Sequence, residues 1–153
     1  MPDSPPVSAL TDHLGFWLRA VSNHVSHAFA GKLAAEGVTV AEWVMMRALY
    51  AAEPMAPSRL ADEMGMTRGA ITKLADRLIG KGLVVREASP DDARAQTLAL
   101  TRRGAARVPK LAALADRNDA ECFGHLSGVD RETLERLLKQ LAETGGVTTV
   151  PID

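Results

Sequence analysis

The sequence has few of the residues on which several protein classes depend. Its 153 residues include one cysteine, Cys122, which excludes an intramolecular disulfide framework and a thiol-rich metal site. Aromatic residues make up only 4%, which disfavours recognition of single-stranded nucleic acid by base stacking. No apolar run approaches the roughly 20 residues that a membrane-spanning helix needs. Residues 1–6 also lack the basic start of a signal peptide, so we expect a cytoplasmic protein without membrane association.

The charge of the chain is nearly balanced overall but unevenly distributed. The formal net charge is −1, yet residues 57–110 carry eleven basic and six acidic side chains, a net of +5. Residues 1–56 and 111–153 have net charges of −2 and −4. Because screening confines electrostatic fields to about 10 Å, the local excess matters more than the sum. The basic middle segment is compatible with a phosphate-binding surface and equally with a solvated face, so charge alone leaves both open.

The first half of the chain has four segments with helical periodicity. Their apolar residues recur every three or four positions, and residues that favour helix ends separate them. Thr39 and Glu42 have the spacing of a capping box at the start of the second segment, and Pro54 is expected to stop it. The predicted helices span residues 9–35, 39–52, 57–65 and 67–81.

The pattern changes after Gly82. Residues 83–88 are short and β-branched, residues 97–101 alternate between polar and apolar, and turn-forming residues lie between them, which predicts a β-hairpin. Helical spacing then resumes in two leucine-rich segments that are separated at residues 127–128 and end at 145. The predicted fold is therefore mainly α (α+β), in the order α-α-α-α-β-β-α-α.

The central elements are the parts of a winged helix-turn-helix, which we assign to residues 39–101. The outer helical regions, residues 9–36 and 102–145, have more apolar surface than such a small module can cover. We therefore expect these flanking helices to pair with those of a second chain in a homodimer. Residues 1–8 and 146–153 are expected to be flexible tails.

The fourth predicted helix has an outward face that is suited to duplex DNA. Its apolar side chains share the opposite face, and Gly69 allows the backbone to approach closely. Free N–H groups at its start favour an anion, and a recognition helix inserts this end into the major groove. Any amphipathic surface helix has a polar face, so this helix alone does not distinguish a DNA-binding helix from an ordinary surface helix. The predicted contacts are Thr67, Arg68, Gly69, Thr72, Lys73 and Arg77.

The predicted hairpin, or wing, carries a second group of candidate DNA contacts. Arg86 lies on its first strand and Arg94 in its loop, where an exposed guanidinium suits the narrow, negative minor groove. We expect Asp92 to pair with Arg86 and hold the wing in shape. Asp76, on the outward face of the helix, would repel phosphate and could instead hold Lys73 in place. The alternative for the hairpin loop is that its residues are a generic turn cluster without a role in binding.

The combined pattern resembles the MarR family (multiple antibiotic resistance regulators). The wing carries the most specific part of the resemblance, an Asp-x-Arg motif followed by Leu-Thr-x-x-Gly. Ala93 stands where many members carry a second arginine. The similarity covers about residues 10–145, and the stretches that carry it are residues 38–43, 60–61, 72–78, 82–86, 90–94 and 98–104.

The resemblance implies a bacterial homodimer that binds palindromic double-stranded DNA and represses transcription. In many relatives, a small aromatic acid or phenolic effector releases the DNA by binding between the dimerisation helices and the DNA-binding lobe. Here the first two helices would line that cleft, and Arg47 could pair with a ligand carboxylate. For each residue the alternative is core packing or a solvated position. The candidate pocket residues are Trp17, His24, Trp43, Met46, Arg47 and Tyr50.

Other chemistries have less support. His24 and His27 could form half of a metal site, which Glu42 and His125 would complete only if the fold brought them together. Cys122 could sense oxidants, or it could be a small buried hydrophobe. No nucleophile–base spacing and no phosphate-binding glycine loop is present, so neither an enzyme nor a cofactor is expected. The alternative functions are a winged helix that docks acidic protein, a helical protein that binds small molecules, and a metal- or redox-responsive variant of the regulator.

Overall fold

The computed structural model describes residues 4–92, 94–148 and 150–152, and within them the predicted element order is confirmed. Six α-helices and one two-stranded antiparallel sheet are preceded by a short 3-10 turn, so the fold is mainly helical, as expected. The elements are η1 (Leu10–Asp12), α1 (Leu14–Ala34), α2 (Val40–Leu49), α3 (Pro57–Met64), α4 (Arg68–Gly80), β1 (Val84–Ala88), β2 (Gln96–Leu100), α5 (Arg102–Phe123) and α6 (Gly128–Thr144).

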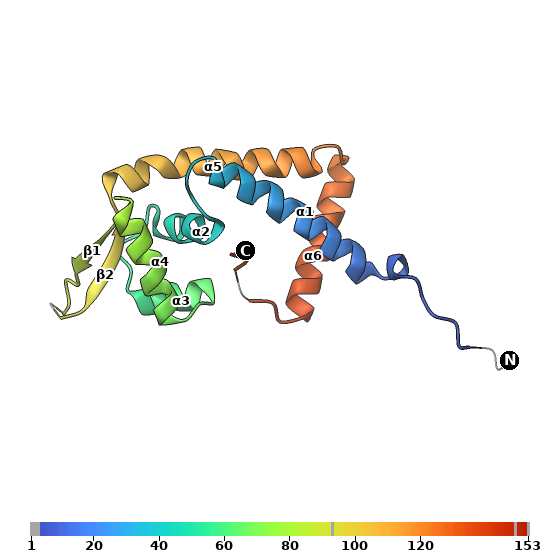
Figure 1. The fold of residues 1–153 in the computed structure, drawn as a ribbon, viewed down its shortest axis with the longest axis horizontal. Helices are drawn as coiled ribbons and strands as arrows, with labels where there is room; N and C mark the ends of the chain where they lie inside the picture. The colour runs from blue at the N-terminus through green and yellow to red at the C-terminus, as the bar shows by residue number, and fades with distance from the viewer. Residues whose placement is uncertain (1–3, 93, 149, 153) are drawn as a thin grey trace.

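The long helix α5 connects two regions of the molecule (Figure 1). Helices α2, α3 and α4 form a lobe at one end of α5, and the hairpin projects from that lobe at the left of the view. Helix α6 lies at the other end, and α1 runs diagonally against α5. The lobe and the hairpin together correspond to the winged helix-turn-helix that the sequence predicts at residues 39–101.

The core lies mainly inside this lobe. Apolar side chains from α2, α3, α4 and both strands are almost fully buried there, and α5 closes one side of the core with Val108 and Leu111. The start of α5 packs so tightly on the base of the hairpin that a Cβ at Gly104 would lie 2.1 Å from the Leu83 carbonyl oxygen. Only glycine fits this contact, which fixes the wing relative to α5.

Helix ends follow local chemistry, with one difference from the prediction. The capping box is present, because Thr39 N–H donates to Glu42 Oε1 at 3.0 Å and Glu42 N–H donates to Thr39 Oγ1 at 3.1 Å. We expected Pro54 to stop α2 near residue 52, but the helix ends at Leu49. Tyr50 is extended and Ala51 adopts a positive φ of 54°, so the chain has left the helix before the proline.

The described part of the C-terminal segment contacts the rest of the protein. Ile152 is partly buried against the core, and Pro151 lines a cavity beside α1 and α2. Both residues lie in the segment 146–153 that we expected to be a flexible tail, and Pro151 itself is exposed. In the part of the chain that the structure describes, no helix is long and apolar enough to cross a lipid bilayer.

Candidate nucleic-acid interface

Helix α4 presents a continuous polar face to solvent. Ile71, Leu74, Ala75 and Leu78 are buried, so the helix can face the core in only one orientation. The Thr67 hydroxyl accepts from Ala70 N–H at 3.1 Å, which caps the exposed N-terminal end. A Cβ at Gly69 would meet no atom within 4 Å, so this end is open to close approach. The six predicted contacts, all exposed, are Thr67, Arg68, Gly69, Thr72, Lys73 and Arg77.

The wing is tied to this helix by an ion pair that differs from our expectation. Arg86 on β1 pairs with Asp76 of α4, and not with Asp92 as predicted. Among the ion pairs of the described residues, Asp76 therefore contacts Arg86, and not Lys73, the alternative partner that the sequence offered. Asp76 is separated from Arg86 by only ten residues, and the chain folds strand β1 back beside α4. Arg86 therefore compensates the charge of the carboxylate that would repel phosphate, and the ion pair links the wing to the helix.

Asp92 shapes the tip of the wing in a different way. Its Oδ1 accepts a hydrogen bond from Arg94 N–H at 2.9 Å, and its carbonyl accepts from Ala95 N–H at 3.0 Å. These bonds close a local turn and leave Arg94 exposed. A structural role for Asp92 is thus supported by a backbone contact, whereas Ala93 lies outside the described residues. Strands β1 and β2 pair in register below the tip, from Val84 with Leu100 to Ala88 with Gln96.

The C-terminal end of α4 is anchored by contacts that the sequence does not predict. Lys81 Nζ donates to the Gly37 carbonyl at 2.8 Å and to Glu42 Oε1 at 3.0 Å, and lies 2.8 Å from Glu42 Oε2. Burial raises the pKa of the Glu42 carboxyl, but hydrogen bonds from Lys81 and Thr39 outweigh it and hold that pKa below its usual value. We call Gly37, Thr39, Glu42 and Lys81 the α2–α4 clamp.

The six candidate pocket residues do not line one cavity in this structure. Met46 is fully buried in the core. Arg47 is exposed, and its guanidinium carbon lies 5.9 Å from the centroid of the Tyr50 ring. Trp17 and His24 line one cavity, and Trp43 lines another. Helical periodicity placed these side chains on the right helices, but it could not show that α2 turns Trp43 and Arg47 to different faces.

The cavity at Trp43 has a volume of about 300 Å³ and lies between α1, α2 and α5. Its wall is mostly apolar, and the polar groups of its lining side chains are one hydroxyl, one amide, one carboxylate and the indole N–H of Trp43. The amide belongs to Asn118, which is buried and joins α5 to α1 by donating to the Val25 carbonyl at 3.2 Å. The lining residues are Val25, Ser26, Phe29, Val40, Trp43, Val44, Ala115, Asn118, Asp119 and Pro151.

The cavity at Trp17 contains the other reactive side chains. His24, His125 and Cys122 line it together, whereas Glu42 belongs to the α2–α4 clamp and cannot join them. Cys122 is only partly buried. Among the described residues, no three histidine, cysteine or acidic side chains are arranged to hold a metal ion.

The chain is similar to known bacterial regulators over most of its length. Residues 36–95 match the model of the MarR family. A protein of Thauera aromatica named for transcriptional regulation of the hcr operon is 32% identical over 134 residues, which cover 87% of this chain and 81% of the relative.

Solved structures agree with this family match. A mutant MarR of Escherichia coli in complex with operator DNA is 25% identical, with a TM-score of 0.75 over 88% of this chain and 99% of that one. A MarR family protein of Mycobacterium tuberculosis in complex with p-aminosalicylic acid is 25% identical, with a TM-score of 0.66 over 85% and 98%. The shared winged-helix architecture and the extent of these matches show that the chain belongs to the MarR family of transcriptional regulators.

Proposed function

We propose that this regulator binds palindromic double-stranded DNA as a homodimer and represses transcription by occupying its operator. The observation that carries the proposal is that the same lobe presents two exposed features, the open N-terminal end of α4 and Arg94 at the wing tip. The Asp76–Arg86 ion pair links the helix to the first strand of the wing. The related MarR of E. coli has been solved on operator DNA, which supports the same use of this architecture here.

The two elements would divide the recognition between them. Arg68, Thr72 and Lys73 extend from α4, whose N-terminal part can enter the major groove and contact base edges. The Thr72 hydroxyl already donates to the Arg68 carbonyl at 3.0 Å, so it offers bases an acceptor and a methyl group. Arg94 would enter the neighbouring minor groove, where shape and potential rather than base identity attract a guanidinium.

Replacement of Arg94 tests the wing directly. Arg94→Ala should weaken binding to every duplex by about 1–3 kcal/mol and make the salt dependence shallower by roughly one charge, because a minor-groove contact reads little sequence. Binding is measured by fluorescence anisotropy across a salt series. Arg136→Ala, on the exposed surface of α6, is the matched control and should bind like the parent. Equal affinities for Arg94→Ala and the parent would remove the wing from the interface.

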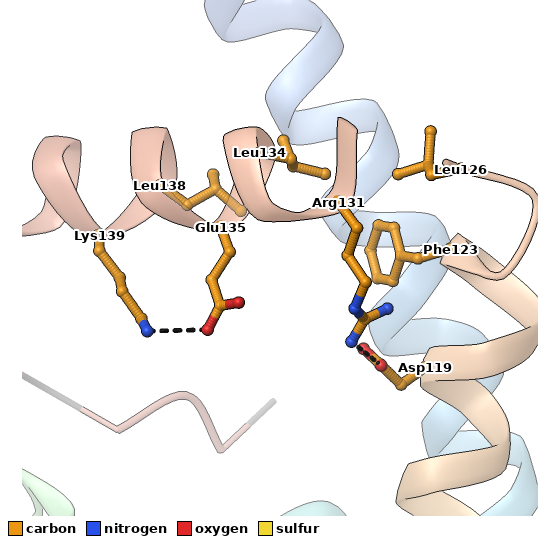
Figure 2. Close-up of a pocket in the computed structure, with 8 residues that line it drawn as sticks. All are labelled: Asp119, Phe123, Leu126, Arg131, Leu134, Glu135, Leu138 and Lys139. Atoms are coloured by element: carbon orange, nitrogen blue, oxygen red, sulfur yellow. Dashed lines mark hydrogen bonds and ion pairs between the residues drawn. The ribbon is translucent and has the colours of Figure 1, made fainter. Parts of the chain in front are cut away.

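The homodimer is supported by apolar surface that the single chain leaves exposed. Leu134, Leu137, Leu138 and Leu141 lie along α6 with between 37% and 61% of their surface accessible. Figure 2 shows Leu134 and Leu138 at a crevice beside Phe123 and Leu126, where the Arg131–Asp119 ion pair joins α6 to α5. Leu14 and Trp17 of α1 are also exposed. A second copy would cover these faces and place two α4 helices on one duplex.

Light scattering distinguishes a dimer from a monomer. The parent protein should have twice the 16.3 kDa mass of the chain at micromolar concentration, and Leu141→Asp should move it towards the monomer because a carboxylate would be buried in the interface. Gln140→Asp places the same charge on the neighbouring exposed position and should remain dimeric. A parent protein that stays at 16.3 kDa would contradict the homodimer.

We also propose that a small phenolic molecule binds in the cavity at Trp43 and releases the DNA. Two relatives of this fold are described with aromatic acids, one in complex with p-aminosalicylic acid and the other regulated by 6-hydroxynicotinic acid. In this chain, however, no lysine or arginine is among the described residues that line the cavity. Its one carboxylate, Asp119, pairs with Arg131. Lys32 contacts Asn118 at 3.0 Å and Glu121 at 2.8 Å, so its charge is already compensated.

Calorimetric titration with phenol and with benzoate tests this preference. Phenol should bind at least about tenfold more tightly, because a carboxylate would lose its hydration without gaining a cation. Ala115→Phe should abolish binding of phenol by filling the cavity, whereas Arg47→Ala should leave it unchanged because Arg47 is exposed outside the lining. If benzoate bound more tightly than phenol, or if Arg47→Ala no longer bound benzoate, the ligand would be an aromatic carboxylate that pairs with Arg47, as the sequence suggested. Either result would exclude the phenolic ligand.

A further inference from the structure

The α2–α4 clamp is a costly way to stabilise a protein. Glu42 is only 1% exposed, and removing a carboxylate from water carries a large desolvation penalty. Apolar side chains of similar volume often stabilise a core as well as a buried ion pair does. What an ion pair adds is direction, since hydrogen bonds to Gly37 and Glu42 are satisfied in only one position of the Lys81 ammonium.

The rest of the contact between α4 and the core is apolar packing, which restricts the helix angle less than hydrogen bonds do. Its buried face consists of Ile71, Leu74, Ala75 and Leu78, and apolar packing of this kind tolerates small rotations better than hydrogen bonds do. At the middle of the helix, Asp76 binds the wing rather than the lobe. The clamp is therefore the polar contact that fixes the C-terminal end of α4 to α2.

A small change of angle at the C-terminal end of α4 would cause a larger displacement at its N-terminal end. Helix α4 has 13 residues, which corresponds to a length of roughly 20 Å. Because the rise of 1.5 Å per residue sets this length, a tilt of about 6° around Lys81 would move the N-terminal end of the helix by about 2 Å. Hydrogen bonds to base edges need donor–acceptor distances within a few tenths of an ångström, so such a displacement would break them. Contacts to phosphates through flexible side chains would survive it.

We propose that Lys81 is a positioning residue for DNA recognition, which sets the angle of α4 by its contacts with Gly37 and Glu42. The inference rests on the proposed function, because it concerns the selectivity of DNA binding. Lys81 itself is 41% exposed through its side chain, so a direct phosphate contact is the competing explanation. The two explanations differ in what they expect from Glu42, which is buried and cannot touch DNA.

Four single variants of the chain, and the double variant Lys81→Met/Glu42→Gln, separate the two explanations. Lys81→Met removes the ammonium, Glu42→Gln weakens its partner while keeping the Thr39 cap, and Lys81→Arg tests whether another cation restores the contact. Arg107→Met is the matched control, because Arg107 donates to the neighbouring Glu36 carbonyl at 2.6 Å but reaches it from α5. Each protein is titrated with a duplex selected from a random pool by the parent and with an unselected duplex of the same length. Thermal unfolding is recorded in parallel.

Positioning predicts a loss of selectivity in both clamp variants. Lys81→Met and Glu42→Gln should each lose at least roughly tenfold in affinity for the selected duplex, and much less for the unselected one, because base contacts carry the discrimination. The double variant Lys81→Met/Glu42→Gln should bind the selected duplex as tightly as Lys81→Met does. Lys81→Arg should recover most of the lost affinity. Arg107→Met should keep its selectivity even if its melting temperature falls as far.

A different pattern would overturn the inference. If Lys81→Met weakened both duplexes equally while Glu42→Gln bound like the parent, Lys81 would be a phosphate contact. If selectivity fell in Arg107→Met in proportion to its melting temperature, the clamp would contribute stability alone. If the parent protein bound neither duplex, the proposed function itself would fail, which is distinct from a failure of the clamp.

Discussion

The orientation of α4 depends on one constraint, the burial of its apolar face against the lobe. Once Ile71, Leu74, Ala75 and Leu78 point inward, Gly69, Thr72 and Lys73 must point outward. Full burial of an aliphatic side chain contributes about 1.5–3 kcal/mol, so this orientation is strongly preferred over any other. The polar contacts then refine it, with Asp76 fixing the wing at the middle of the helix and Lys81 fixing its C-terminal end.

The fold separates recognition from assembly. The lobe and the wing hold the candidate DNA contacts, whereas most of the exposed large apolar residues lie in α1 and α6. Helix α6 and the N-terminal end of α1 lie away from the lobe, beyond the far end of α5 (Figure 1). The cavity at Trp43 lies where these regions meet, because α1 and α5 form one side of it and α2 the other. Trp43 follows Glu42 directly in α2, so one short helix contacts both the cavity and the α2–α4 clamp. A ligand that moved α2 would therefore act on the element that anchors the recognition helix.

The sequence predicted local structure well because local chemistry determines it. The capping box at Thr39 can be recognised within a few residues, and the structure confirms it. The third predicted helix ends and the fourth begins at residues that the structure shows to be caps, Gly65 and Thr67. The outward face of α4 follows from helical period alone. The early end of α2 at Leu49 was missed because no proline or glycine marks it.

Contacts between distant residues could not be predicted in this way. The spacing of Arg86 and Asp92 suggested a pair within the wing, but the chain brings Asp76 of α4 to Arg86 instead. Lys81 and Glu42 are 39 residues apart, and only the Glu42 capping box hinted that its carboxylate would be held in a buried place. The division of the candidate pocket residues between two cavities could not be predicted for the same reason, since periodicity does not show which helices face each other across a cavity.

Selection from a random pool of double-stranded DNA would show whether two copies of this chain read a palindromic duplex. We expect enrichment of two inverted half-sites with centres about one helical turn, or about 34–36 Å, apart, because each α4 would occupy one major groove. The bound stoichiometry should be two chains per duplex. Failure to enrich any sequence over the starting pool, or enrichment of a single half-site bound by one chain, would rule out this mode of recognition.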